Sequence, residues 1–153
     1  MNNEKDIDTK TLRLNLSEYI CEDKFNDIVN IYRILKESGD FDETWEPEDL
    51  TFSDFKELVK NGGHNYWGDF IILDLLKEYL DINIVVLYNN DFTNEYYYYS
   101  IFHEYNNDKN TIILLYENEI HFKLVGYFSG NKMITKFDKY SIPVEILTMV
   151  KIR

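Results

Sequence analysis

Residue types that could carry acid–base or nucleophilic chemistry are few in this sequence: three histidines and one cysteine. His121 follows an acidic turn that contains Glu117 and Glu119, and it opens an apolar run that alternates like a strand. The two carboxylates favour the charged imidazole, and a histidine at a strand end can act as a general acid or base. The alternative is a polar residue on an edge strand without a catalytic role, and the residues by themselves favour that alternative.

The other two histidines have less informative surroundings. His64 lies in NGGHNYWGD, between a glycine pair and the step Trp67-Gly68, where a turn between helices is a commoner interpretation than a binding edge. His103 follows an aromatic strand and reads as structural or exposed. The histidines lack metal-type spacing such as His-x3-His, so the sequence predicts no metal site and no other cofactor.

The cysteine, Cys21, is a poor candidate for a nucleophile. It stands in EYICEDKF, where the carboxylates of Glu22 and Asp23 disfavour the thiolate that would attack a carbonyl carbon. We therefore expect Cys21 to be a buried or half-buried structural thiol. A single cysteine also excludes an internal disulfide and is typical of a reducing compartment.

Composition limits the class of protein. The 153 residues, of which 44% are hydrophobic and 16% aromatic, supply the core of one folded domain, which we expect to span residues 1–153. The net charge of −12 disfavours nucleic acid and membrane surfaces and favours a basic protein partner. The sequence shows no apolar run of the ~20 residues that cross a bilayer and no apolar signal core, which predicts an intracellular, cytoplasmic protein.

The first half of the sequence has the apolar periodicity of amphipathic helices. These helices are predicted over residues 12–20, 25–35, 52–59 and 69–80. The second is predicted to end at Ser38-Gly39, and the third to be capped by Thr51 or Ser53 and to end at 61–63. The fourth is apolar almost all round, so we expect it to be the central helix and to lie against a sheet.

The second half has the short apolar or alternating runs that are typical of strands. The predicted strands cover residues 82–88, 95–102, 111–116 and 120–128. The tripeptide Ser129-Gly130-Asn131 reads as a tight hairpin turn, and Ser141 with Pro143 reads as the start of a last helix. Helices followed by strands predict the α+β class, with the N-terminal helices packed on a mixed or antiparallel sheet.

The order of these motifs resembles that of the ovarian-tumour-domain (OTU) cysteine proteases, a family of deubiquitinases. NYWGDFIILDLLKEYLDINIVVLY is similar to the family's Trp-Gly step, central helix and following strand. TIILLY-ENE-IHFKLVGYF is similar to its next strand, turn and catalytic histidine followed by an aromatic residue. LRLNLSEYI resembles the Leu-Arg helix that follows the family's nucleophile helix, and the last stretches, GYFSGNKMITKF and IPVEIL, are similar to OTU-like proteins of large DNA viruses.

The resemblance covers residues 12–150 and implies an OTU-like architecture with particular site residues. His121 would take the position of the general base, and Trp67, Gly68 and Phe122 would lie beside it as binding residues. Trp67 in particular is expected to pack under the strand end that carries His121, which would make its truncation to alanine costly. The implied partner is ubiquitin, because its basic C-terminal tail would suit an acidic surface.

Two departures from the family pattern bear on activity. The family's nucleophile motif, Asp-Gly-x-Cys, precedes the Leu-Arg helix and is absent here, so relative to the family we expect an N-terminally incomplete domain without a nucleophile. Lys123, two positions after His121, cannot accept a hydrogen bond from the imidazole as the Asp or Asn of several family members does. We therefore expect a non-catalytic OTU-like protein that binds ubiquitin or another protein.

Two alternatives stay open at this point. The chain could be the C-terminal portion of an active OTU protease whose nucleophile lies upstream of Met1. In such an enzyme a thiolate paired with the imidazole attacks the isopeptide carbonyl and forms a thioester. The chain could also be a structural or interaction protein of a viral assembly, because a fold by itself does not choose a partner.

Overall fold

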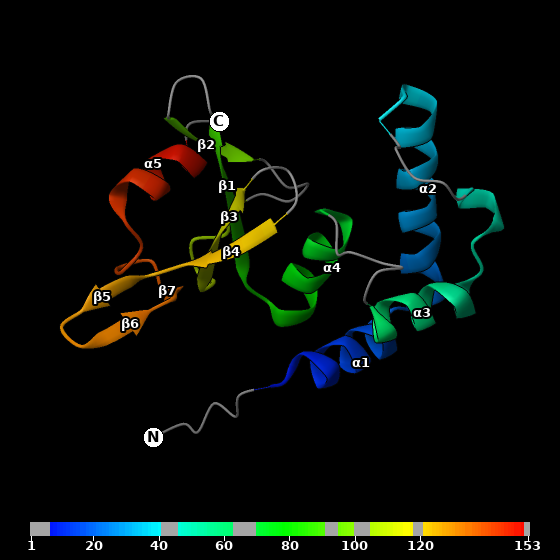
Figure 1. The fold of residues 1–153 in the computed structure, drawn as a ribbon, viewed down its shortest axis with the longest axis horizontal. Helices are drawn as coiled ribbons and strands as arrows, with labels where there is room; N and C mark the ends of the chain where they lie inside the picture. The colour runs from blue at the N-terminus through cyan, green and yellow to red at the C-terminus, as the bar shows by residue number, and fades with distance from the viewer. Residues whose placement is uncertain are drawn as a thin grey trace. The chain divides into compact units, whose positions relative to one another are not determined.

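The computed structural model describes residues 7–40, 46–62, 70–90, 95–99, 105–117 and 121–151 of the chain (Figure 1). The chain divides into two compact units, Met1–Ile71 and Ile72–Arg153. Helices make up the described part of the first unit, and a sheet with helices makes up the second. The predicted α+β class is therefore confirmed, whereas one domain over residues 1–153 stays a prediction.

The first unit contains helices that the amphipathic pattern predicts, namely α1 (Thr9–Tyr19), α2 (Glu22–Ser38) and α3 (Phe52–Asn61). It also contains the 3-10 turn η1 (Pro47–Asp49), which the pattern does not predict. Local signals fix their ends: the Thr51 side chain accepts a hydrogen bond from the Asp54 N–H at the start of α3, and α2 ends at Gly39. Both of these predicted boundaries are confirmed.

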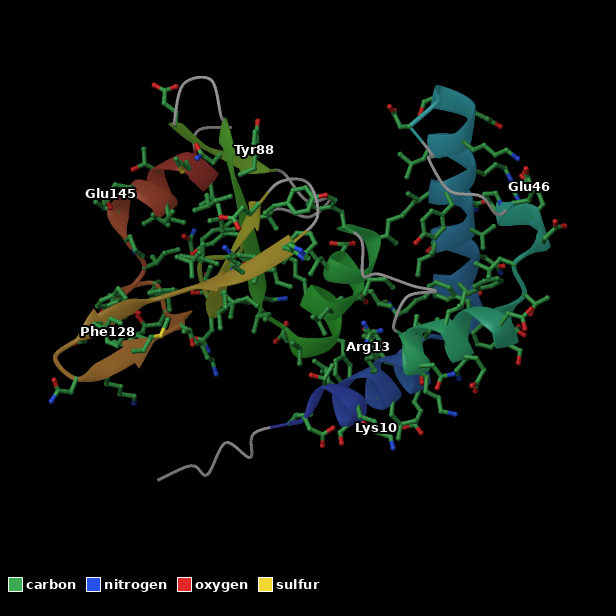
Figure 2. The ribbon with its side chains drawn as sticks, in the orientation of Figure 1. Lys10, Arg13, Glu46, Tyr88, Phe128 and Glu145 are labelled. Atoms are coloured by element: carbon green, nitrogen blue, oxygen red, sulfur yellow. The ribbon has the colours of Figure 1, made fainter. Side chains whose placement is uncertain are left out.

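Helices α2 and α3 of this unit meet through aromatic side chains. The rings of Phe25 and Phe55 have their centroids 5.8 Å apart, and Phe55 is fully buried. Arg13 of α1 donates from its guanidinium to the Val59 carbonyl, with 3.0 Å between the two atoms (Figure 2). This places a cation at the C-terminal end of α3, where the helix dipole stabilises positive charge.

A mixed sheet forms the centre of the second unit. Its elements are α4 (Phe70–Leu80), β1 (Asn83–Asn90), β2 (Glu95–Tyr99), β3 (Thr111–Glu117), β4 (His121–Val125), β5 (Tyr127–Ser129), β6 (Lys132–Ile134), β7 (Lys136–Phe137) and α5 (Val144–Lys151). The strand order is β2-β1-β3-β4, in which β1 and β3 are parallel and the other neighbours are antiparallel.

Strand β1 is buried on both of its faces. Val85 and Leu87 belong to a core cluster that also contains residues of α5, and Ile84 and Val86 point the other way and are equally buried. Apolarity on both faces is typical of a strand in a parallel pair. Helix α4 precedes β1 and buries Ile71, Ile72 and Leu75. The predicted helix over 69–80 is confirmed as a helix with a buried side, whereas its packing on the sheet stays a prediction.

The predicted strand 120–128 is wrong as a single strand, because it breaks at Gly126 into β4 and β5. A Cβ atom at Gly126 would lie 2.6 Å from the carbonyl oxygen of Ile134, so only glycine allows this close approach of the two backbones. Beyond Gly126 the chain leaves the sheet as the β5–β6 hairpin and returns at β7, which pairs with β3 (Figure 1). We call residues 126–135 the β-arm.

The β-arm is a two-residue hairpin. Ser129 pairs with Lys132 across it, and Gly130 at the first turn position has a φ of +62°. Because a side chain rarely adopts that backbone conformation, glycine suits the position, and the predicted hairpin turn is confirmed. One face of the arm is anchored, since the Tyr127 ring stacks on Phe137 of β7 with 5.8 Å between centroids.

Lys77 is a charged residue in the interior of the second unit. Its side chain on α4 is buried, and this loss of hydration lowers the Lys77 pKa below its ordinary value of 10.5. The carboxylate of Asp74 opposes the shift and the charge of Lys109 adds to it. Lys77 therefore keeps its proton to higher pH in the unfolded chain than in the folded chain. The free energy of unfolding thus rises with pH between the pKa of Lys77 in the folded chain and its pKa in the unfolded chain.

We expect Lys77→Met to raise the urea midpoint at neutral pH, because the substitution removes a buried charge and keeps most of the apolar stem. The difference from the parent protein should shrink as the pH approaches 10.5. Urea titrations at a series of pH values measure both effects. Lys10→Met on the exposed side of α1 is the matched control and should change little at any pH. A gain for Lys77→Met that stayed constant with pH would contradict the assignment to charge burial.

Candidate functional site

The candidate site lies at the carboxyl ends of the parallel strands β1 and β3. His121 is the first residue of β4 and pairs in register with Glu117, the last residue of β3. The same end of the sheet carries Tyr88, which is labelled in Figure 2, and its cross-strand neighbour Tyr116. Ligands of open sheets with parallel strands commonly bind at this edge, since loops and strand ends meet there. The strand-end position of His121 is confirmed.

The imidazole of His121 is exposed, and the carboxylate of its cross-strand neighbour Glu117 is paired with another side chain. Glu117 forms an ion pair with Lys123, the residue that lies diagonally across the β3–β4 hairpin. Across the described stretches of chain, no hydrogen bond or ion pair holds the His121 ring. Within those stretches, nothing therefore fixes the orientation of the imidazole.

Phe122 packs across the hairpin and is half-buried. Its ring stacks on that of Tyr116, the residue directly opposite on β3, with 4.6 Å between centroids and an angle of 24° between the planes. Aromatic cross-strand pairs of this kind stabilise antiparallel strands. A binding role for Phe122 stays a prediction, and the packing shows how the residue would be held in place for it.

The other predicted site residues cannot be placed beside His121. Trp67, Gly68 and His64 lie in residues 63–69, and His103 lies in residues 100–104, all outside the described part of the chain. The prediction that Trp67 packs under the strand end of His121 therefore stays a prediction.

The expectation that Cys21 is buried is wrong, because its side chain is exposed. Cys21 is the N-cap residue of α2, with an extended backbone and no hydrogen bond from its side chain to the helix. Its neighbour Ile20 is only 2% exposed and takes the interior position, so the thiol faces outward. Cys21 belongs to the first compact unit and His121 to the second.

Two residues of the site have only a weak signal in the sequence. Tyr88 and Tyr116 end the apolar runs INIVVLY and TIILLY, and the parallel pairing of β1 with β3 brings them into register. A tyrosine at the end of each of two strands could have indicated this edge, but the sequence does not state that the strands are parallel neighbours. The structure thus adds a row of half-buried aromatic residues, Tyr88, Tyr116 and Phe122, in register across three strands at the end of the sheet where His121 begins β4.

Neither a metal centre nor a membrane span is found in the described ranges. No group of three or more His, Cys, Asp and Glu side chains there is placed to hold a metal ion. Their helices are too short or too polar to cross a bilayer. Comparisons of the chain with protein-family models, with curated proteins and with solved structures find no match. Arguments about function therefore rest on the residues and on their arrangement.

Proposed function

We propose that this chain is an OTU-like protein that binds ubiquitin, or a protein segment with similar chemistry, and does not hydrolyse it. The observation that carries the proposal is the position of His121. It is exposed at the start of β4, it is followed by Phe122 on the stacked ring of Tyr116, and it stands at the carboxyl end of a parallel strand pair. The resemblance to the OTU family implies the same order along the chain: a strand, a turn, the histidine and an aromatic residue.

The chemistry of the same hairpin supports binding over hydrolysis. Lys123 stands where several family members place an orienting acid or amide, and it pairs with Glu117. The Nζ group of lysine has no acceptor, so it cannot hold the imidazole in one tautomer. Cys21 is the N-cap residue of α2 in the first compact unit, whereas His121 belongs to the second, so no contact in the described part of the chain pairs the two as nucleophile and base.

Charge supports a protein partner with a basic segment. The chain has 28 acidic and 16 basic residues, so a basic tail such as the C-terminus of ubiquitin is attracted and nucleic acid is repelled. The half-buried rings of Tyr88, Tyr116 and Phe122 would supply the apolar part of the contact, because aromatic residues dominate the energy of protein interfaces.

We expect the purified chain to leave ubiquitin conjugates uncleaved and to form no adduct with a ubiquitin-based electrophilic probe. We also expect ubiquitin to bind, and Phe122→Ala to weaken that binding about tenfold through loss of one anchor. Mass spectrometry after probe treatment measures the first result, and a ubiquitin titration followed by NMR measures the second. Phe128→Ala, the same change in an exposed phenylalanine of the β-arm, is the matched control.

Other outcomes separate the alternatives. An adduct that disappears both in Cys21→Ala and in His121→Ala would identify Cys21 as the nucleophile and overturn the non-catalytic assignment. If a longer chain that adds an upstream cysteine becomes labelled, and the labelling requires His121, the chain is the C-terminal portion of an active protease. Absence of both adduct and binding would remove ubiquitin as the partner and favour an interaction role in another assembly.

A further inference from the structure

Glu117, the last residue of β3, has two basic residues within its reach on β4. His121 is its partner in register, and Lys123 lies two residues further along the same strand. Strand alternation turns all three side chains to one face of the sheet. Directly opposite residues of an antiparallel pair have Cβ atoms about 4.5–5.5 Å apart, and a diagonal neighbour about 7–8 Å away is still within reach of a long side chain. The imidazole and the ammonium group therefore compete for one carboxylate.

The lysine holds this carboxylate. The Lys123 ammonium forms an ion pair with Glu117, and among the described residues no hydrogen bond or ion pair joins Glu117 to His121. A lysine ammonium is fully charged at neutral pH, whereas an ordinary imidazole is mostly neutral there. The carboxylate therefore gains more from the lysine than from the ring, although the ring is its nearer neighbour in the register.

The surroundings of His121 contain few other charged groups. Strand β4 is the last in the order of its sheet, so β3 is the described strand that pairs with it. On the face that carries His121, Val125 packs against the core cluster together with apolar residues of α5. Glu145 is the charged residue among the described side chains of that helix, and Figure 2 shows it away from the start of β4. Glu117 and Lys123 are thus the charged groups that the described part of the chain places on the ring.

We propose that Lys123 is a positioning residue that acts through Glu117: by engaging the carboxylate, it keeps the imidazole of His121 unpaired. Without the lysine charge, Glu117 would accept a hydrogen bond from an imidazole N–H and hold the ring in one tautomer. Lys123 thus decides whether His121 is a single ring or half of a carboxylate–imidazole pair, the arrangement that orients histidines in acid–base catalysis. The inference does not rest on the proposed function, because it is tested without ubiquitin.

NMR of the ring nitrogens of His121 over a pH series tests the proposal with the full chain. Lys123→Met removes the charge and the donor and keeps most of the length of the side chain. We expect the neutral ring to change from a mixture of tautomers in the parent chain to one tautomer in this variant. The midpoint of the His121 titration should also move to higher pH by about half a unit, a small shift because the Glu117 and Lys123 side chains are 38% and 59% exposed.

Three further variants separate the role of Glu117 from other effects. Lys123→Arg keeps the positive charge and should behave like the parent chain. Lys132→Met makes the same chemical change at an exposed lysine of β6 and should leave the His121 signals unchanged. Lys123→Met combined with Glu117→Gln removes only the repulsion between two cations, so its midpoint should move less than in Lys123→Met and both tautomers should remain.

The outcomes decide the proposal in either direction. A single tautomer that appears in Lys123→Met and requires Glu117 supports it. The proposal is overturned if Lys123→Met leaves the tautomers of His121 mixed, if the effects of Lys123→Met persist in the Glu117→Gln background, or if Lys132→Met produces the same effects. A ring that is already held in one tautomer in the parent chain would overturn it as well.

Discussion

Phe137→Ala is expected to destabilise the second unit by about 3–5 kcal/mol, the range for loss of a fully buried phenylalanine ring. Phe137 is 1% exposed, and it belongs to the core cluster together with Ile113 and Val85. It is also the residue through which the two-residue strand β7 pairs with Thr111 of β3. Its truncation therefore leaves a cavity at the point where the β-arm returns to the sheet.

The matched control is Phe128→Ala, which makes the same chemical change at a side chain that is 72% exposed. We expect it to change the free energy of unfolding by less than about 0.5 kcal/mol. Urea denaturation followed by circular dichroism measures both variants. Hydrogen exchange of the β3 amides should quicken in Phe137→Ala and not in Phe128→Ala. Equal effects of the two substitutions would contradict the burial of Phe137 and the exposure of Phe128.

Local signals in the sequence are sufficient to predict where the helices begin and end. Thr51 begins α3 and Gly39 follows α2 because each residue satisfies the backbone groups of one helix end, and no distant contact is needed for that. The positions of the strands are predictable for a similar reason, since polar turns flank each apolar run.

Pairing between distant segments is not predictable in the same way. The parallel pairing of β1 with β3 joins residues 28 positions apart in the register Asn83 with Thr111, and local periodicity does not contain it. The break at Gly126 has the same origin, because its cause is the approach of the Ile134 carbonyl from the returning strand. Strand β7 has only two residues, which is too short for any alternation to show.

In the candidate site, too, some features follow from local sequence and others depend on pairing between distant segments. His121 at a strand start follows from the sequence, whereas the engagement of Glu117 by Lys123 depends on the register of the hairpin. Cys21 was expected to be interior because thiols are commonly buried. The side chain of Ile20 fills that interior position instead, and a chain that turns between α1 and α2 cannot direct both residues inward.

Asn83→Ala is expected to destabilise the second unit by about 3 kcal/mol, since loss of one side chain leaves several buried groups unpaired. Asn83 is 1% exposed at the start of β1. Its amide nitrogen donates to the carbonyls of Asn106 and Lys109, at 2.7 and 3.2 Å, and lies 3.2 Å from the hydroxyl of Thr111. Its amide oxygen accepts from the Asn106 N–H at 2.9 Å.

These hydrogen bonds hold the loop that leads into β3, at the opposite end of the parallel strands from His121. Asn110→Ala is the matched control: its side chain is exposed, and only its backbone carbonyl accepts from the Asn83 N–H, at 2.7 Å. We expect it to change the free energy of unfolding by less than about 0.5 kcal/mol. Urea midpoints measure both variants. If Asn83→Ala were as stable as Asn110→Ala, the hydrogen bonds of the Asn83 side chain would contribute no net stability, which would contradict the prediction.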